Sequence, residues 1–105
     1  MKARIYRYTF EIVEENNGDN VFTNSEEGTM RLGLTDYVSQ KIYIHRDLSL
    51  ELKRRTLAHE LSHAFLFGYG LDSRGLDNEL VCNFVANCYD DITRIVNEYM
   101  EEIYG

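Results

Sequence analysis

Two histidines and a glutamate lie close enough in this sequence to act together on one metal ion. They are His59, Glu60 and His63, in the run His59-Glu60-Leu61-Ser62-His63. On an α-helix, residues at positions i and i+4 stack on one face, so both imidazoles can reach the same ion. Glu60 then projects about 100° away from His59 and flanks the ion without binding it. A carboxylate in that position suits a general base that accepts a proton from water at the metal.

The spacing is the H-E-x-x-H pattern of zinc metallopeptidases, in which both histidines are zinc ligands. A catalytic zinc takes three protein ligands and leaves a further position for water, so one ligand has to come from elsewhere. No histidine follows His63. Leu66 and Tyr69 stand at the positions where the extended metzincin pattern requires Gly and His, which excludes that arrangement.

Glu79 is the strongest candidate for the third ligand. It opens the last predicted helix, about residues 78–104, on the face opposite the apolar stripe of that helix. Cys82 and Ala86 share this face, and their small side chains would let the histidine-bearing helix approach closely. Asp72 and Asp77, in the glycine-bearing connection between the two helices, are the alternatives.

The histidine-bearing helix is expected to begin after a cap at Asp47 or Ser49 and to run to about Phe67, because Gly68 starts a break there. Its leucines gather on one face and its histidines on the opposite face. The helix is therefore expected to lie between a core and a site.

Short strands are predicted ahead of this helix. Residues 2–14 alternate between polar and apolar types and are predicted as one half-buried strand, followed by a turn and a short return segment at residues 16–23. Residues 30–34 and 40–44 are predicted as two further strands around a turn at residues 35–37. The sequence thus indicates an α+β fold, with a small antiparallel sheet of three or four strands, the zinc-bearing helix and a long C-terminal helix.

The composition indicates one acidic globular domain over residues 1–105. The net charge of −7 would repel a phosphate backbone, so direct binding to nucleic acid is not expected. No apolar run approaches the length of a membrane span, and the basic start leads into an alternating strand rather than a signal region. Cys82 and Cys88, six residues apart on one predicted helix, point away from each other and are expected to be reduced. A cytoplasmic protein without a membrane partner is expected.

Three stretches together resemble the ImmA/IrrE family of zinc metallo-endopeptidases, which is common in phages and mobile elements. They are Ile42-Tyr43-Ile44 ahead of the helix, Thr56-Leu57-Ala58-His59-Glu60-Leu61-Ser62-His63-Ala64, and Glu79-Leu80-Val81-Cys82-Asn83-Phe84-Val85-Ala86. The last stretch is similar to the family's E-x-x-A-N-x-F-A, with Cys82 in place of Ala and Val85 in place of Phe. The resemblance covers roughly residues 33–95.

The resemblance implies a zincin-like fold with one Zn²⁺ per chain, held by His59, His63 and Glu79, and with Glu60 as the general base. Family members usually have a helix ahead of the sheet, and many carry a DNA-binding or sensor domain. Neither is expected here, so the resemblance implies a minimal catalytic unit of phage or mobile-element type. It also suggests a regulatory protein, such as a repressor, as the substrate.

Four further residues are candidates for supporting roles. His45 at a strand end, Tyr69 and Tyr89 each carry a group that can donate a hydrogen bond to a transition-state oxyanion. Asn83, one turn after Glu79, can orient a metal ligand. Each of the four also has a purely structural interpretation.

Two functions from different classes fit these residues. The first is zinc-dependent hydrolysis of peptide bonds, with a protein or peptide substrate expected to pair with an edge strand beside the cleft, formed by residues 40–44 or by the neighbouring strand. The alternative is a catalytically silent protein-binding module stabilised by the metal. An open coordination position and the presence of Glu60 favour the enzyme, and a closed site with four ligands would favour the module.

Overall fold

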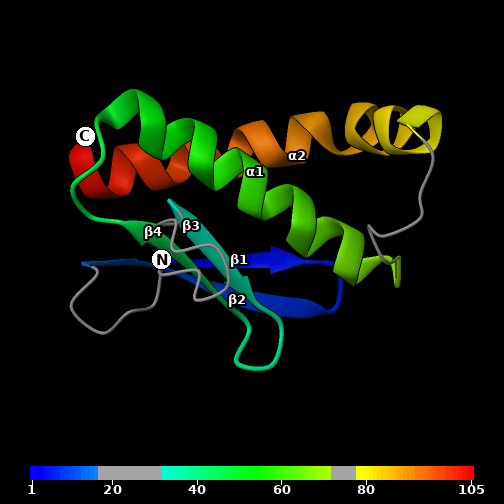
Figure 1. The fold of residues 1–105 in the computed structure, drawn as a ribbon, viewed down its shortest axis with the longest axis horizontal. Coiled ribbons are helices and arrows are strands. Elements are labelled where there is room, and N and C mark those ends of the chain that lie inside the picture. Colours follow the sequence, from blue (N-terminus) through cyan, green and yellow to red (C-terminus); the bar gives the residue numbers. More distant parts are fainter. Residues whose placement is uncertain (17–31, 72–77) are drawn as a thin grey trace, which may run out of the picture.

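The computed structural model describes residues 1–16, 32–71 and 78–105. In these ranges a four-stranded sheet lies on one side and two helices cover one of its faces (Figure 1). The elements are β1 (Lys2–Ile5), β2 (Tyr8–Glu15), β3 (Gly33–Asp36), β4 (Lys41–His45), α1 (Leu50–Gly68) and α2 (Asn78–Tyr104). The predicted α+β class is confirmed. The return segment expected at residues 21–23 lies outside the described residues.

The first predicted strand is two strands joined by a tight turn. β1 and β2 pair antiparallel, and Ile5 stands opposite Tyr8 across the turn residues Tyr6 and Arg7. Tyr6 has a φ of 57°, in the left-handed region that few residues other than glycine adopt. The prediction of one continuous strand over residues 2–14 is wrong, because this turn contains none of the Gly, Asn or Asp residues that usually mark a hairpin.

The sheet has the order β1-β2-β4-β3 and is mixed. β1 pairs antiparallel with β2 and β3 with β4, but β2 and β4 run parallel, with Ile12 opposite Ile42. The expectation of a purely antiparallel sheet is therefore wrong for the central pair. The alternation of residues determines which side chains face the helices, and both isoleucines do so, but it carries no information about strand direction.

The turn between β3 and β4 falls two residues later than predicted. Asp36 ends β3, and its Oδ1 accepts hydrogen bonds from the backbone N–H groups of Val38 and Ser39 at 3.0 and 3.2 Å. Gln40 completes the turn with a φ of 56°. As a result Thr35, which the sequence placed in the turn, belongs to the strand.

The position of β4 in the sheet corrects another expectation. β4 is paired on both sides, with β2 and with β3, so it is not an edge strand. Its immediate neighbour β3 forms one of the two edges among the described strands, and β1 forms the other. Of the two strands proposed to border the cleft as an edge, only the neighbour qualifies.

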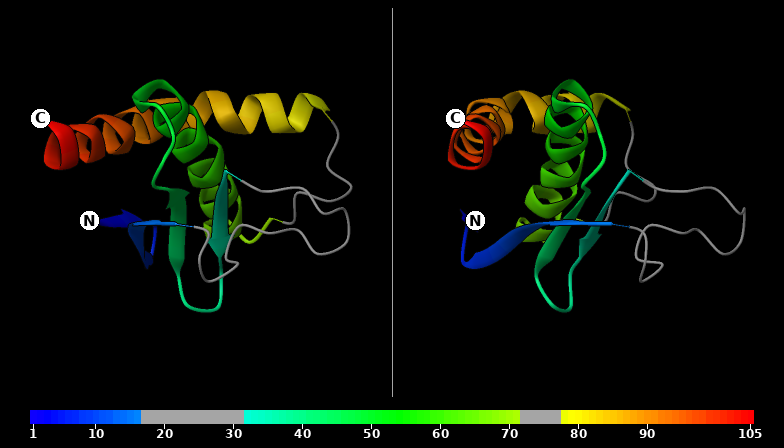
Figure 2. Two further views of the ribbon diagram at one scale, coloured as in Figure 1. Left: turned by 60° about the vertical axis from the view of Figure 1, so that its left-hand side comes forward. Right: turned by 90° about the vertical axis from the view of Figure 1, so that its left-hand side faces the viewer.

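Helix α1 follows its predicted course. The side chain of Ser49 caps it by accepting a hydrogen bond of 3.2 Å from the backbone N–H of Leu52, and the helix ends at Gly68. Its inner face packs on the sheet through completely buried Leu57, Leu61 and Ala64. Figure 2 shows both helices on the same side of the sheet, with the C-terminal end of α1 coming nearer to the strands than α2 does.

Helix α2 has the predicted bounds, but only its central part enters the core. Five of its residues are buried there: Cys88, Ile92, Ile95, Val96 and Tyr99. The expected apolar stripe continued from Val81 to Ile103, whereas Val81 is half-buried and Ile103 is 45% exposed. No helix in the described part of the chain is long and apolar enough to cross a membrane.

Candidate metal centre

A cavity of about 670 Å³ lies between α1 and the edge strand β3. One wall comes from β3 and its flanking residues, and the other comes from α1; together they are Leu32, Gly33, Leu34, Thr35, Tyr37, Arg55, Thr56, His59, Glu60 and His63. All three residues of the H-E-x-x-H pattern therefore face one space. Helix α1 therefore lies between the core and this cavity.

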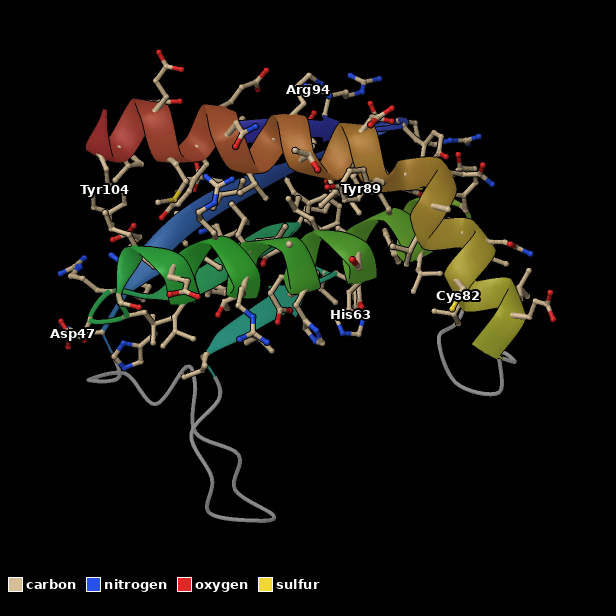
Figure 3. All side chains as sticks on the ribbon, turned by 90° about the horizontal axis from the view of Figure 1, so that it is seen from above. Asp47, His63, Cys82, Tyr89, Arg94 and Tyr104 are labelled. Atoms are coloured by element: carbon tan, nitrogen blue, oxygen red, sulfur yellow. The ribbon has the colours of Figure 1, made fainter. Side chains whose placement is uncertain are left out.

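The two histidines are arranged as a pair of metal ligands would be. Their Nε2 atoms lie 3.3 Å apart, and their rings are inclined by 77°. A tetrahedral zinc ion with Zn–N bonds of about 2.0–2.1 Å separates two ligand nitrogens by about 3.3–3.4 Å. His59 is exposed and His63 half-buried, so an ion can reach both rings from solvent. Figure 3 shows His63 projecting from α1 on the side away from the C-terminal half of α2.

Glu60 is buried, with 7% of its surface exposed, and its carboxylate is held by the sheet. The hydroxyl of Thr35 donates to Oε1 of Glu60 at 2.7 Å and lies 3.2 Å from the backbone carbonyl oxygen of the same residue. The carboxylate is thus fixed beside the histidine pair by a residue of β3. The sequence predicts a chemical role for Glu60 but does not indicate which residue holds its side chain in place.

Gly33 allows β3 to approach α1 this closely. A Cβ atom built on Gly33 would lie 2.6 Å from Cγ2 of Thr56 and 3.1 Å from Cγ of Glu60. The first distance is far shorter than a normal contact between carbon atoms. A side chain at this position would therefore push the strand away from the helix and lengthen the hydrogen bond between Thr35 and Glu60.

Among the described residues, no third candidate ligand lies beside the two histidines. Over the described ranges, no three His, Cys, Asp or Glu residues lie close enough together to hold a metal ion. Glu79 is exposed on the first turn of α2. Cys82, one turn further along, lies on the same side of α1 as His63 (Figure 3). Asp72 and Asp77 lie outside the described residues, so the choice among the three carboxylates stays a prediction.

The four supporting candidates lie outside the cavity lining. His45 is buried at the end of β4, where its Nδ1 accepts a hydrogen bond of 3.2 Å from the backbone N–H of Asp47. Tyr69 caps the C-terminus of α1 and is half exposed. Asn83 and Tyr89 are exposed on α2. Their suggested roles stay predictions.

Sequence reasoning missed the contribution of β3 to the site. Thr35 was assigned to a turn and Gly33 to an ordinary strand position. Gly33 and Thr35 lie on the same face of the strand, with Leu34 on the other face. Two small residues on one face permit close approach of a helix, so this pattern is a weak indication of the contact between β3 and α1. Arg55, which lines the cavity one turn before His59, was also not singled out.

A comparison with protein-family models gives a match over most of the chain. Residues 9–88 match the model described as the IrrE N-terminal-like domain, a peptidase family. The matched range contains both walls of the cavity and the first turns of α2. Searches of curated proteins and of solved structures gave no significant match.

Proposed function

This chain belongs to the peptidase family described as the IrrE N-terminal-like domain, and on that premise we propose that it is a zinc-dependent metallopeptidase. The observation that carries the proposal is the separation of 3.3 Å between the Nε2 atoms of His59 and His63, in the same cavity as a buried glutamate. Two imidazole nitrogens at that distance match the donor set and the spacing that zinc prefers.

Each residue of the site has a distinct role in this proposal. His59 and His63 would hold the ion through Nε2, and Glu79 is the residue proposed to complete the ligand set. A bound zinc ion supplies Lewis acidity, which polarises a peptide carbonyl and makes water a stronger acid. Glu60 accepts a proton from the attacking water and delivers it to the nitrogen of the leaving amine. Its Oε1 is occupied by the hydroxyl of Thr35, so Oε2 is the oxygen proposed to carry the proton.

The proposed substrate is a protein or peptide that lies extended along β3. This strand is an edge among the described strands and forms one wall of the cavity, so a peptide paired with its backbone would pass beside the histidines. A nucleic-acid substrate does not fit a chain with a net charge of −7. The resemblance to ImmA/IrrE proteins supports a regulatory protein, such as a repressor, as the target.

The substitution Glu60→Gln tests the proposal, because glutamine keeps the size and polarity of the side chain but cannot act as a base. Zinc content, measured by elemental analysis, is expected to stay near one ion per chain. Peptide hydrolysis is expected to fall by roughly 10²- to 10⁴-fold, the usual cost of losing a general base.

The same variant separates the enzyme from the metal-stabilised binding module. Glu60→Gln protein is used first to capture partners from a lysate of the source cells, and each captured partner is then incubated with zinc-loaded wild-type protein. Cleavage by the wild type and not by the variant supports the peptidase. A partner that binds both proteins and stays intact across neutral pH would refute the peptidase and favour the binding module.

A further inference from the structure

We propose that Thr35 is a positioning residue that fixes the carboxylate of Glu60 for proton transfer. The inference rests on the peptidase proposed above, because it assigns Glu60 the role of general base. It adds a residue that lies outside the H-E-x-x-H pattern and on a different element of the fold.

The contact between Thr35 and Glu60 is short and is made inside the cavity. The hydroxyl of Thr35 lies 2.7 Å from Oε1 of Glu60, within the usual range for a hydrogen bond from a hydroxyl to a carboxylate. Glu60 is 7% exposed, so little water competes for that oxygen. In the described part of the chain, no other side chain donates a hydrogen bond to this carboxylate.

A glutamate without such a contact would sample several rotamers, because three torsion angles separate its carboxylate from the backbone. A general base has to lie within hydrogen-bond reach of the proton that it accepts, and each unproductive rotamer lowers the fraction of competent molecules. The hydroxyl of Thr35 selects one arrangement by fixing Oε1. The second oxygen of the carboxylate is then presented from a fixed direction.

Two features of β3 make the contact possible. Gly33 lets the strand approach α1, since a Cβ atom there would lie 2.6 Å from Cγ2 of Thr56. Pairing with β4 places Thr35 opposite the buried Ile42, so its side chain faces the helix rather than the uncovered side of the sheet. The strand position of Thr35 and the helix position of Glu60 thus determine the contact together.

The competing explanation is a structural one, in which Thr35 only joins β3 to α1. The two explanations differ in what a substitution changes. A purely structural hydrogen bond would affect the stability of the fold and leave turnover by the folded protein unaltered. A positioning residue would affect kcat, with KM and zinc content preserved.

The test compares two substitutions at Thr35. Thr35→Val keeps the shape of the side chain and removes the hydroxyl, whereas Thr35→Ser keeps the hydroxyl. Thr9→Val, an exposed site on β2 away from the cavity, is the matched control. Zinc-loaded proteins are assayed on fluorescently labelled casein and on a random peptide library. Thr35→Val is expected to lower kcat about tenfold with KM unchanged, and Thr35→Ser to retain most of the wild-type rate.

A second measurement does not depend on activity. The ¹³C carboxylate resonance of Glu60, assigned by its loss in Glu60→Gln, is expected to shift in Thr35→Val and to keep its position in Thr35→Ser and Thr9→Val. A resonance and a kcat that are both unaffected in Thr35→Val overturn the inference while the peptidase stands. A shifted resonance with an unaltered kcat would mean that the contact between Thr35 and Glu60 is only structural, and this result also overturns the inference. A zinc-loaded wild-type protein that cleaves none of these substrates, nor any partner captured with Glu60→Gln, refutes the peptidase itself, and the positioning role with it.

Discussion

A largely buried ion pair outside the cavity lining gives the sharpest test of how this fold is held together. Lys53 of α1 is 4% exposed, and its Nζ donates to Oε1 of Glu14, at the end of β2, at 3.1 Å. The hydroxyls of Tyr99 and Tyr104 donate to the other oxygen of Glu14, and Lys53 also contacts the hydroxyl of Tyr104. These four residues, the Glu14 cluster, connect the sheet, the start of α1 and the end of α2.

The substitution Lys53→Met keeps the aliphatic stem of the lysine and removes its charge. Removal of one partner from a buried ion pair usually costs about 3–5 kcal/mol, because the other charge is left without compensation. The side chain of Glu14 is 16% exposed and keeps two tyrosine hydroxyls as donors. We therefore expect the free energy of unfolding at neutral pH to fall by about 2–3 kcal/mol, a loss of roughly 10–20 °C in Tm for a domain of this size.

The pH dependence of this loss follows from the pKa values of the pair. Burial raises the pKa of Glu14, but hydrogen bonds from Tyr104, Tyr99 and Lys53 outweigh it and hold that pKa below its ordinary value of 4.5. Its contribution to stability is present above pH 4.5 and is lost as the pH falls through the folded-state pKa. Burial lowers the pKa of Lys53, but its contacts with Tyr104 and Glu14 raise it above 10.5, so its contribution is lost only as the pH rises through the folded-state pKa.

Urea denaturation followed by circular dichroism measures the effect at pH 7 and in steps down to about pH 3. The difference between wild type and Lys53→Met is expected to be largest at neutral pH and to shrink as Glu14 becomes protonated. The double variant with Glu14→Gln should be more stable at pH 7 than Lys53→Met alone, because no unpaired charge remains. Lys2→Met, at an exposed position, is the control for loss of a positive charge. An unfolding free energy of Lys53→Met equal to that of wild type at pH 7 would refute the reasoning.

Three further predictions concern the site and the cysteines. Loss of a residue that only hydrogen-bonds to a metal ligand usually weakens metal binding by roughly 10- to 100-fold, and Glu79→Ala is expected to weaken zinc binding by more than that. Competition with a chromogenic chelator measures the affinity, and an unchanged affinity would show that another residue is the third ligand. Gly33→Ala is expected to lower the free energy of unfolding, measured in urea, by about 1–3 kcal/mol. Thr56→Ser removes the methyl group that would clash with the new Cβ atom, so the double variant is expected to recover part of that loss. Exposed Cys82 is expected to react with a thiol reagent in the folded protein, whereas Cys88, whose pKa is raised by burial, reacts only after unfolding; rapid reaction of both thiols would contradict the packing of α2.

The helices could be predicted from the sequence because their signals are local. Ser49 as a cap and Gly68 as an end are properties of a few neighbouring residues, and α2 was placed correctly by its apolar period. The sheet was harder, because strand direction and order depend on partners far away in the sequence. The sequence does not indicate the break at Tyr6 for a related reason. A tyrosine in the left-handed region is held there by its surroundings and not by its own conformational preference.

In the candidate site too, contacts within one helix could be predicted from the sequence, whereas contacts between elements could not. His59, Glu60 and His63 belong to one helix, so their spacing alone implies a shared face, and the structure places them around one cavity. The contact between Thr35 and Glu60 joins residues from two elements and depends on the place of β3 in the sheet. Glu79 depends on the path of the chain between α1 and α2, which spacing does not determine.

The correction from β4 to β3 as the edge strand changes how binding and catalysis are connected. With β4 at the edge, a bound peptide would have paired with a strand other than the one that donates a hydrogen bond to the carboxylate of Glu60. β3 is an edge among the described strands and also holds the carboxylate of Glu60 through Thr35. A substrate paired with β3 would therefore restrain the same short strand that positions the proposed base. Changes that loosen β3, such as Gly33→Ala, should for this reason lower kcat as well as stability, whereas Lys53→Met should lower stability alone.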